Sequence, residues 1–510
     1  MVAPKLPTPL IEVDVHTNLR PAVPLAVVVH ASEPDANPVL GPHAEQIGVD
    51  NEWLTAAGVT GAAGSAQVVA RPHARPPVGW VLGIGAGTVQ DYRRAGAALL
   101  RAVDARAAAD QQSGRRPSRS LQVALPSEIT AEQVAAFVSG AVLGGYSFTI
   151  SGDPPPPRTR TVTLLASAHL GPAAQRALVL ARATALSRDL ANMPSNTKDP
   201  QWLAATAARL AANVSGLTIQ VRDERWLAQH SFGGVLAVGG GSARPPRLIE
   251  LRWRRPRGAR PGPHLLLIGK GITFDTGGIS IKPAKGMHVM RTDMAGGGTV
   301  IAALIAIASL RVPLRVTGLV PAAENHVSGS AYRPGDVVRH VDGRTTEVTN
   351  TDAEGRIVLA DALGYAVRAL RPDVLVDVAT LTGAIRVALG WRTGGFFATD
   401  DQLAAQVLAA GERAGEQWWR MPLGYDMVEL ANGHSDDVRS ELADVRQCPP
   451  GPGAIAAALF LREFTAGLPW AHLDIAGAAR SEKSYDDVSA GATGFAARTL
   501  VELAAALSAG

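Results

Sequence analysis

Short apolar runs that alternate with helical segments constrain the fold of this chain more than any other feature. Beyond about residue 170, apolar runs of strand length recur at residues 264–268, 316–320, 373–378 and 471–475. Segments with helical character separate them, at residues 297–308, 357–370, 402–414 and 454–464. Buried strands that alternate with helices are typical of an α/β protein in which a mixed sheet is sandwiched between helices. We therefore expect this architecture for the C-terminal part of the chain.

The first 170 residues show a second, smaller α/β pattern. Strand-like runs and Ala-rich helical segments alternate there, at residues 23–29, 79–84, 92–109, 131–144 and 161–165. Because 510 residues exceed what one core usually holds, we expect two domains, residues 1–170 and 171–510. The glycine-rich segment 83–87 is predicted to be a tight strand-to-helix turn. A nucleotide site is less favoured there, since the segment lacks dinucleotide spacing and a P-loop lysine.

Composition indicates a globular protein without a strongly charged surface. Hydrophobic residues make up 46% and charged residues 18%, and the net charge is only +4. Arginines cluster at Arg252, Arg254, Arg255, Arg257 and Arg260. A solvated loop explains this cluster better than a nucleic-acid surface, which needs a wider basic face. Nucleic acid is therefore not expected as a partner.

Cysteine usage and apolar run lengths favour a cytoplasmic protein. Cys448 is the single cysteine, so neither an intrachain disulfide nor a cysteine-based zinc site can form, as is usual in a reducing compartment. The amino-terminal segment lacks the pattern of a signal peptide. No uninterrupted apolar run reaches the roughly 20 residues of a membrane span. We expect no membrane association.

Four carboxylates beside glycines form the most informative polar pattern. Asp352 and Glu354 are two residues apart, and in an extended segment such side chains point to the same face. Asp275 follows the apolar run at 264–268, and Asp293 precedes a helical segment. The glycines around them indicate that backbone approaches a ligand closely.

These four anions could gather in one place only if their charge were balanced. Without compensation, mutual repulsion would force some of them to take up protons. Two divalent cations would balance four carboxylates, and oxygen-rich ligation suits Mn²⁺, Mg²⁺ or Zn²⁺. Such a pair can activate a bridging water and polarise a carbonyl. The spacing alone leaves a second interpretation open, in which the acids and the nearby Lys270 and Lys282 form separate surface ion pairs.

Several sequence blocks resemble the signatures of the leucyl aminopeptidase family (M17, the cytosol aminopeptidases). The most specific are residues 269–283, 290–294 and 350–356; others are residues 321–325, 333–337, 379–384, 470–477 and 493–495. The resemblance covers essentially all of residues 175–505, and residues 1–170 carry little of it. It implies a metal-dependent aminopeptidase that releases the N-terminal residue of peptides, with leucine and other apolar residues preferred.

The resemblance also implies roles for individual residues. Lys270, Asp275, Asp293 and Glu354 match the ligands of one metal ion, Mn²⁺ or Zn²⁺. Asp275, Asp352 and Glu354 match the ligands of a second, and a water bridging the two ions would attack the peptide bond. Lys282 matches the catalytic lysine that polarises the scissile carbonyl. Arg356 matches the arginine that holds a bicarbonate as general base, and Met290, Asn350, Thr380 and Leu381 match positions that line the substrate site.

The same resemblance implies a homohexamer and leaves two alternative functions. A dipeptidase specialised for a substrate such as cysteinyl-glycine would use the same catalytic centre. Some family members are thought to bind DNA through their N-terminal domain, although no contiguous basic stripe supports this here. The chain departs from the commoner family pattern at His288, Arg291 and Gln447. None of these is a ligand position, so we expect them to affect substrate preference rather than catalysis.

Overall fold

The computed structural model describes residues 6–31, 37–151, 156, 158–423, 440–449 and 451–509. The amino-terminal segment, expected to carry no signal peptide, therefore lies partly outside the described residues. The chain separates into two compact units. The first comprises Met1–Ala185 together with Glu482–Ala490, and the second comprises Leu186–Ser481 together with Gly491–Gly510.

The first unit contains a sheet that is mostly parallel. Within the described residues its order is β1 (Glu12–His16), β7 (Thr161–Leu165), β6 (Ser120–Ala124), β2 (Leu25–His30), β5 (Val78–Gly83) and β4 (Ala66–Ala70), with β3 (Val39–Leu40) beside β2. Only β3 and β4 run antiparallel to their neighbours. The segment 83–87 connects β5 to the helix α2 (Val89–Gln112), so it forms the predicted strand-to-helix turn.

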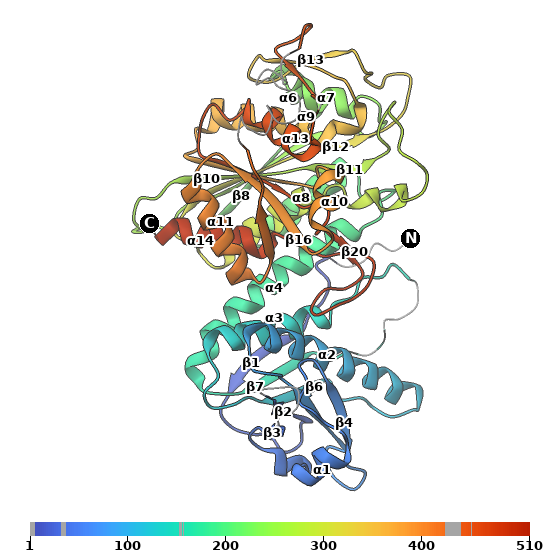
Figure 1. Ribbon diagram of the computed structural model, residues 1–510, viewed down its shortest axis with the longest axis vertical. Helices are drawn as coiled ribbons and strands as arrows, with labels where there is room; N and C mark the ends of the chain where they lie inside the picture. Colours follow the sequence, from blue (N-terminus) through green and yellow to red (C-terminus); the bar gives the residue numbers. More distant parts are fainter. Residues whose placement is uncertain are drawn as a thin grey trace. The chain divides into compact units, whose positions relative to one another are not determined.

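Helices cover both faces of this sheet. Since successive side chains of a strand point to opposite faces, a single strand contributes to two apolar cores. Val28 of β2 packs in a core with residues of α2, α3 (Ala131–Gly144) and α4 (Gly171–Asn192). Its neighbours Val27 and Val29 pack instead with residues of η1 (Ala44–Ile47) and α1 (Asn51–Ala56). Figure 1 shows α2 and α3 on one side of the sheet and α1 on the other. In the described part of this unit, the remaining element is η2 (Ala168–Leu170).

The second unit is built on a large mixed sheet. Within the described residues its order is β17 (Gln417–Arg420), β16 (Thr393–Ala398), β19 (Trp470–Asp474), β15 (Val374–Ala379), β10 (His264–Gly269), β12 (Arg315–Asn325), β9 (Arg247–Trp253) and β8 (Leu217–Arg222), and β11 (Gly271–Asp275) pairs with β12. Strands β10, β12, β15 and β19 are parallel. Strand β9 is antiparallel to both β8 and β12, and β16 is antiparallel to β19 but parallel to β17. The expected mixed α/β architecture is confirmed.

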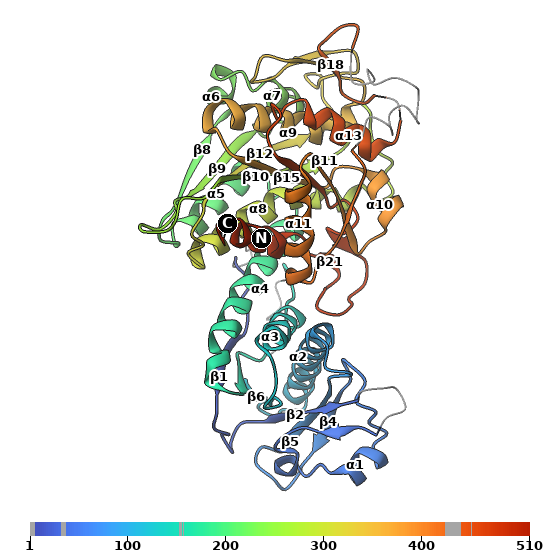
Figure 2. The ribbon, with the colours of Figure 1, turned by 60° about the vertical axis from the view of Figure 1, so that its left-hand side comes forward.

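Two groups of helices enclose this sheet. Helices α7 (Gly233–Gly239), α9 (Glu354–Tyr365) and α13 (Gly453–Arg462) share one apolar core with strand residues such as Leu266 and Ile268. Figures 1 and 2 show α9 and α13 on one side of the central strands, with α8 (Ala295–Ser309) and α14 (Ala497–Ala509) on the other. The central strands are therefore buried on both faces, which explains why they appear as continuous apolar runs.

The described part of the second unit also contains smaller elements. A small sheet contains β13 (Val337–Arg339), β14 (Thr345–Glu347) and β18 (Val445–Arg446), and β20 (Arg480–Ser481) pairs with β21 (Gly491–Ala492). Among the described residues, the other helices are α5 (Pro200–Ala211), α6 (Glu224–Gln229), η3 (Met287–Thr292), η4 (Thr351–Ala353), the π-helical turn η5 (Ala366–Leu370), α10 (Gly383–Leu389) and α11 (Asp401–Ala414).

One stretch of the described residues, Met287–Ser309, is long and apolar enough to cross a membrane. It comprises η3 and α8, and 89% of its most apolar window is buried inside the protein. Its apolar character is therefore explained by its place under the central strands, where every residue from Ala295 to Val300 is buried.

Close packing of backbone fixes the start of α8 against the strand ends. A Cβ atom added to Gly296 would lie 2.1 Å from the carbonyl oxygen of Val378 in β15. One added to Gly297 would lie 2.6 Å from Val320 Cγ1 in β12. No larger residue fits at either position without displacing the helix. The glycines here allow protein segments to approach each other, rather than a ligand, and they bring the residues before α8 to the carboxyl ends of the strands.

Candidate active site and metal centre

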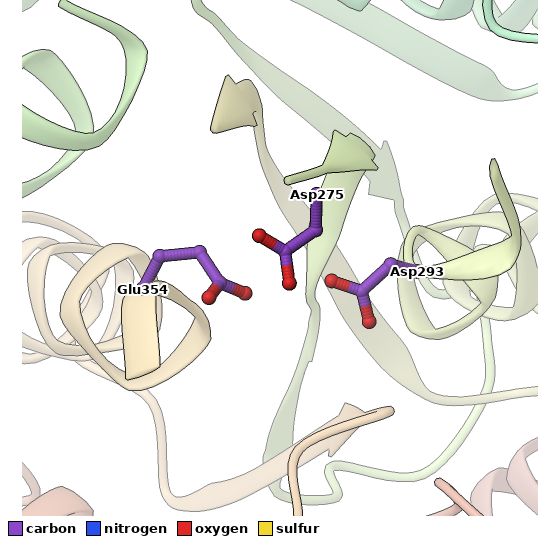
Figure 3. A group of neighbouring side chains, drawn as sticks. All are labelled: Asp275, Asp293 and Glu354. Carbon is purple, nitrogen blue, oxygen red and sulfur yellow. The ribbon is translucent and has the colours of Figure 1, made fainter. Parts of the chain in front are cut away.

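Three buried carboxylates from separate segments meet at one edge of the large sheet. Asp275 is the last residue of β11, Asp293 directly follows η3, and Glu354 is the first residue of α9. One oxygen of each lies within 4.8 Å of the others. Figure 3 shows the three side chains turned toward a common point from three different elements. Asp293 and Glu354 also lie at the starts of α8 and α9, where the helix dipole stabilises negative charge.

Asp352 reaches this site by a route that the sequence did not indicate. Strand β14 ends at Glu347, and Asp352 lies in the 3₁₀ turn η4, where the side chain of Asn350 accepts a hydrogen bond from the Asp352 amide at 2.9 Å. The expectation of an extended segment between Asp352 and Glu354 is therefore wrong. A tight turn that leads directly into α9 brings the two carboxylates to the site.

Two lysines divide the four carboxylates into pairs. Lys270 Nζ lies 2.8 Å from both Asp293 Oδ2 and Glu354 Oε1. Lys282 Nζ lies 2.7 Å from Asp275 Oδ2 and also forms an ion pair with Asp352. The acids and lysines are therefore not the separate surface ion pairs that the spacing left open. They form one cluster, in which Lys270 is almost completely buried.

Burial and mutual repulsion shift the pKa values of this cluster. Burial, followed by repulsion from Asp275, raises the pKa of Glu354 to about 8. Burial likewise raises the pKa of Asp293 and of Asp352. Burial alone would lower the pKa of Lys270 and Lys282, but the surrounding carboxylates raise both above their usual range. The cluster carries more negative charge than its two ammonium groups balance.

The donor set fits divalent cations. Glu354 Oε2 is buried and has no hydrogen-bond partner among the described residues. An unpaired carboxylate oxygen that points among other carboxylates is unfavourable unless a cation binds there. The available donors are carboxylate oxygens and one lysine nitrogen. These residues could hold hard or borderline metal ions such as Mn²⁺ or Zn²⁺.

Gly355 makes room for the Lys270 side chain. A Cβ atom at this position would lie 2.6 Å from Lys270 Cε and 2.8 Å from Lys270 Nζ. Lys270 crosses the first turn of α9 at this point, and its ammonium group then donates to the carbonyl oxygen of Thr380 at 3.0 Å. The glycine between Glu354 and Arg356 is therefore required by the position of the lysine.

A cavity of about 580 Å³ opens beside the cluster. All the residues expected at the site line it except Glu354, which is buried. The lining members are Lys270, Asp275, Lys282, Met290, Asp293, Asn350, Asp352, Arg356, Thr380 and Leu381. Thr380 also supports the cluster directly, because its hydroxyl donates to Asp293 Oδ1 at 2.7 Å. The structure thus brings together every residue that the sequence proposed for this site.

Arg356 is buried at the wall of this cavity. Its Nη1 donates to the carbonyl oxygen of Gln447 at 2.9 Å, and its Nε has no hydrogen-bond partner among the described residues. Burial lowers its pKa below the usual range of arginine, while Cys448 and Glu354 act in the opposite direction. A guanidinium group with an unused donor beside a cavity can bind a small anion.

Gln447 is a functional residue that sequence reasoning did not identify. Its side-chain oxygen accepts hydrogen bonds from the amides of Thr349 and Asn350, both at 3.0 Å, and its Nε2 donates to the Ala353 carbonyl at 3.1 Å. It therefore fixes the loop that carries Asp352. In the sequence, Gln447 is visible only as a departure from the commoner family pattern. Its structural role depends on contacts with residues almost 100 positions away, which no local sequence pattern indicates.

Asp474 is a second residue that only the structure reveals. Its carboxylate accepts hydrogen bonds from the Leu381 amide at 3.1 Å, the Thr382 amide at 3.1 Å, the Thr382 hydroxyl at 2.6 Å and the Ala476 amide at 3.1 Å. It joins the loop after β15 to the segment after β19. His288, in contrast, is exposed and lies outside the carboxylate cluster.

Comparisons with known proteins agree with this site. A model of the "Cytosol aminopeptidase family, catalytic domain" matches residues 185–501. A "Probable cytosol aminopeptidase" of Streptomyces griseus is 40% identical over 513 residues, covering 95% of this chain and 96% of the relative. One of Syntrophotalea carbinolica is 40% identical over 439 residues, covering 84% and 86%.

A solved structure also resembles the whole chain. The "Bottromycin maturation enzyme BotP" is 39% identical and superimposes with a TM-score of 0.80, covering 96% of this chain and 100% of that protein. A second structure of that enzyme is a complex with Mn. The fold and the buried carboxylate cluster define a metal-dependent hydrolase. The chain belongs to the cytosol aminopeptidase family, M17, whose members are metal-dependent aminopeptidases.

Proposed function

We propose that the carboxylate cluster holds two divalent cations and that the enzyme removes N-terminal residues from peptides. Lys270, Asp275, Asp293 and Glu354 would bind one ion, and Asp275, Asp352 and Glu354 the other. The observation that carries this proposal is the convergence of three buried carboxylates within 4.8 Å, with Glu354 Oε2 left unpaired. The two ions would supply an activated bridging water and a positive charge that polarises the scissile carbonyl.

The protein's own residues would orient the peptide and stabilise developing charge. The ammonium group of Lys282 lies at the cavity wall beside Asp275 and Asp352. From there it can donate to the oxygen of the scissile carbonyl, where negative charge develops as the bond is attacked. Arg356 can hold a bicarbonate through its unused Nε donor, and that anion would accept the proton of the attacking water.

Lys270 has to change its protonation state when a cation binds. Its ammonium group now lies between Asp293 and Glu354, the residues that would share an ion with it. Only the neutral amine has a lone pair to donate, and an adjacent dication favours that form. Binding of the cation should therefore release a proton from Lys270.

The lining of the cavity supports a preference for apolar N-terminal residues such as leucine. The apolar residues that line it include Met287, Val289, Met290, Leu381, Ala476 and Ala479. Methionine side chains adapt to apolar groups of different shape. The proposal places Met290, Asn350, Thr380 and Leu381 in contact with substrate. Family membership further supports a cytoplasmic homohexamer that uses Mn²⁺ or Zn²⁺, with residues 171–510 as its catalytic domain.

Metal-titrated hydrolysis of aminoacyl-p-nitroanilides tests this function. Chelator-treated protein should be inactive, and activity on the leucine substrate should return with about two equivalents of Mn²⁺ or Zn²⁺ measured by elemental analysis. Acetyl-leucine p-nitroanilide should not be cleaved, since its amino group is blocked. Activity that survives full removal of metal, or saturates at one equivalent, would contradict the two-metal assignment. Size-exclusion chromatography with light scattering tests the hexamer.

A further inference from the structure

Basic side chains line the active-site cavity in addition to the lysines of the proposed metal cluster. Its acidic lining residues, Asp275, Asp293 and Asp352, all contact Lys270 or Lys282. Among the described residues, the other charged groups that line it are all basic, namely Lys285, Arg356, Arg386 and Arg480. An anion that binds beside one of these basic groups would be stabilised by its positive charge.

Arg386, Trp391 and Arg480 form what we call the guanidinium cluster. The Arg386 guanidinium carbon lies 5.1 Å from the centre of the Trp391 ring, and that of Arg480 lies 5.4 Å from it. Such cation–π contacts hold both arginines near one ring and reduce the freedom of their side chains. Arg386 has no ion-pair partner among the described residues, so this contact does not neutralise its charge.

The guanidinium cluster is assembled by close packing of two segments. Arg386 belongs to α10, Trp391 follows that helix, and Arg480 begins β20. Gly477 allows these segments to meet, because a Cβ atom there would lie 2.1 Å from the carbonyl oxygen of Gly390. Asp474 joins the same two segments through the Leu381 and Ala476 amides. The cluster is therefore tied to the loop whose Thr380 contacts Asp293.

We propose that the guanidinium cluster is a subsite for a carboxylate group of the peptide substrate. This inference rests on the proposed function, since it takes peptides as the substrates and carboxylates are their anionic groups. The guanidinium group of Arg386 can donate two parallel hydrogen bonds to a carboxylate, and Arg480 adds a second positive charge beside the same ring. The carboxylate has two possible sources: the side chain of an acidic N-terminal residue, or the C-terminus of a short peptide.

Two matched substrate pairs distinguish these sources. Glutamyl p-nitroanilide is compared with glutaminyl p-nitroanilide, and Leu-Gly with Leu-Gly amide, using the Mn²⁺-loaded enzyme at low ionic strength. We expect kcat/KM to favour the carboxylate member of at least one pair by on the order of tenfold, which is the effect of about 1.4 kcal/mol. The preference should shrink as salt is added, because partly exposed charges are screened.

Variants test whether the guanidinium cluster causes the preference for the carboxylate-bearing substrate. In the double variant Arg386→Gln, Arg480→Gln, the kcat/KM values of the two members of the favoured pair should differ by no more than about twofold. The turnover of the neutral member should be nearly unchanged. Trp391→Leu, which keeps both charges, should reduce the preference through KM rather than kcat. Arg315→Gln removes one positive charge at the exposed start of β12, outside the cavity lining, and serves as the control for loss of an arginine elsewhere.

Three results would overturn the subsite: equal kcat/KM within both pairs, preference for the neutral members, or a preference that persists in the double variant. Each of them leaves peptide hydrolysis itself intact. Failure of the Mn²⁺-loaded enzyme to cleave any of the four substrates would instead overturn the proposed function, and the subsite with it.

Discussion

At the scale of single residues, the site is a set of charges that balance each other only in part. Four carboxylates face two ammonium groups, and the remaining negative charge is held at the starts of α8 and α9. Each charged residue therefore has two effects, one on the binding of cations and one on catalysis. Substitutions can separate these effects.

Asp352→Ala and Lys282→Ala should fail in different ways. Removal of the Asp352 carboxylate takes away a proposed ligand, so both bound metal and activity should be lost. Removal of the Lys282 ammonium group leaves all proposed ligands in place, so metal content should stay near normal while kcat falls about 100-fold or more. Elemental analysis and steady-state kinetics of both variants measure this. Lys285→Ala is the matched control for loss of a lysine from the cavity wall.

Gly355→Ala should reduce metal affinity and activity without unfolding the protein. The new Cβ atom would lie 2.6 Å from Lys270 Cε, so the lysine has to leave its position between Asp293 and Glu354. Alanine also favours the helix by about 1 kcal/mol relative to glycine, which should limit the loss of stability. We expect metal affinity and kcat to fall at least tenfold, with Tm within a few degrees of wild type. Gly171→Ala, where the new atom contacts nothing within 4 Å, is the control.

Normal activity and metal content in Gly355→Ala would contradict the role given to Lys270. It would show that the lysine can be displaced without consequence. A large drop in Tm would point instead to a structural role of this position in the first turn of α9.

At the scale of elements, strand β10 carries a buried histidine that should make stability depend on pH. Burial lowers the pKa of His264, at the start of β10, to about 4. The ordinary value in an unfolded chain is about 6.5. Above that pH the histidine is neutral in both states and contributes nothing to the pH dependence. As pH falls from 6.5 toward 4, only the unfolded chain takes up the proton, so the folded state loses stability.

The loss should be about 3 kcal/mol across this range, from 1.36 kcal/mol per unit of pKa shift. Chemical denaturation of the wild type and of His264→Gln at pH 7 and pH 4.5 measures it. The variant should lose less stability on acidification than the wild type does. Parallel losses in the two proteins would show that His264 is protonated in the folded state or that other groups dominate.

The elements themselves could largely be predicted from the sequence, because burial on both sides leaves a continuous apolar run. The helix predicted at 131–144 is α3, the strand predicted at 161–165 is β7, and the run at 264–268 is β10 less its last residue. The outer strands β8 and β9 were not predicted. In β8, buried and exposed residues alternate irregularly, so the strand lacks a clear apolar pattern.

The site could be predicted only where its residues lie in short recognisable blocks. Asp275, Asp293 and Glu354 stand in such blocks, and the structure places them together. Their neighbours Gln447 and Asp474 act through contacts with residues more than 90 positions away, which no local pattern indicates. The prediction of an extended segment at Asp352 is wrong because a separation of two residues between carboxylates is compatible with a tight turn as well as with a strand.

At the scale of the whole molecule, cation binding should stabilise the folded protein. The cluster exists only when β11, η3 and α9 are in place, so cations should bind the folded state far better than the unfolded chain. A free concentration 100 times the dissociation constant would add about 2.7 kcal/mol to stability. Differential scanning fluorimetry should show Tm rising by several degrees with Mn²⁺ and falling with a chelator. Glu354→Gln should lose most of this shift, and an equal shift in that variant would show that Mn²⁺ binds elsewhere.

Truncation of the chain at a single position should not yield a well-behaved second unit. Residues Glu482–Ala490 belong to the first unit, where Arg94 Nε lies 3.0 Å from Asp486 Oδ1. A chain that starts at residue 186 keeps this segment without its partners. We expect it to give less soluble protein and a lower Tm than a second truncated chain in which residues 482–490 are replaced by Asn-Gly.

The replacement is compatible with the fold because Ser481 and Gly491 already pair across an antiparallel ladder. Two residues of this type can close such a hairpin. Size-exclusion chromatography and thermal unfolding of both truncated chains measure the difference. Equal yield and Tm would show that the segment does not depend on the first unit.

The separation of the metal-site segments along the chain has a consequence for biosynthesis. Asp275 and Asp293 precede Glu354 by about 80 and 60 positions. At a synthesis rate of roughly 5 to 20 residues per second, about 3 to 12 seconds pass between Asp293 and Glu354. During that interval the nascent chain has only half of the cluster. Its affinity for cations should then be low, so metal loading waits until α9 has been made and has docked on the sheet.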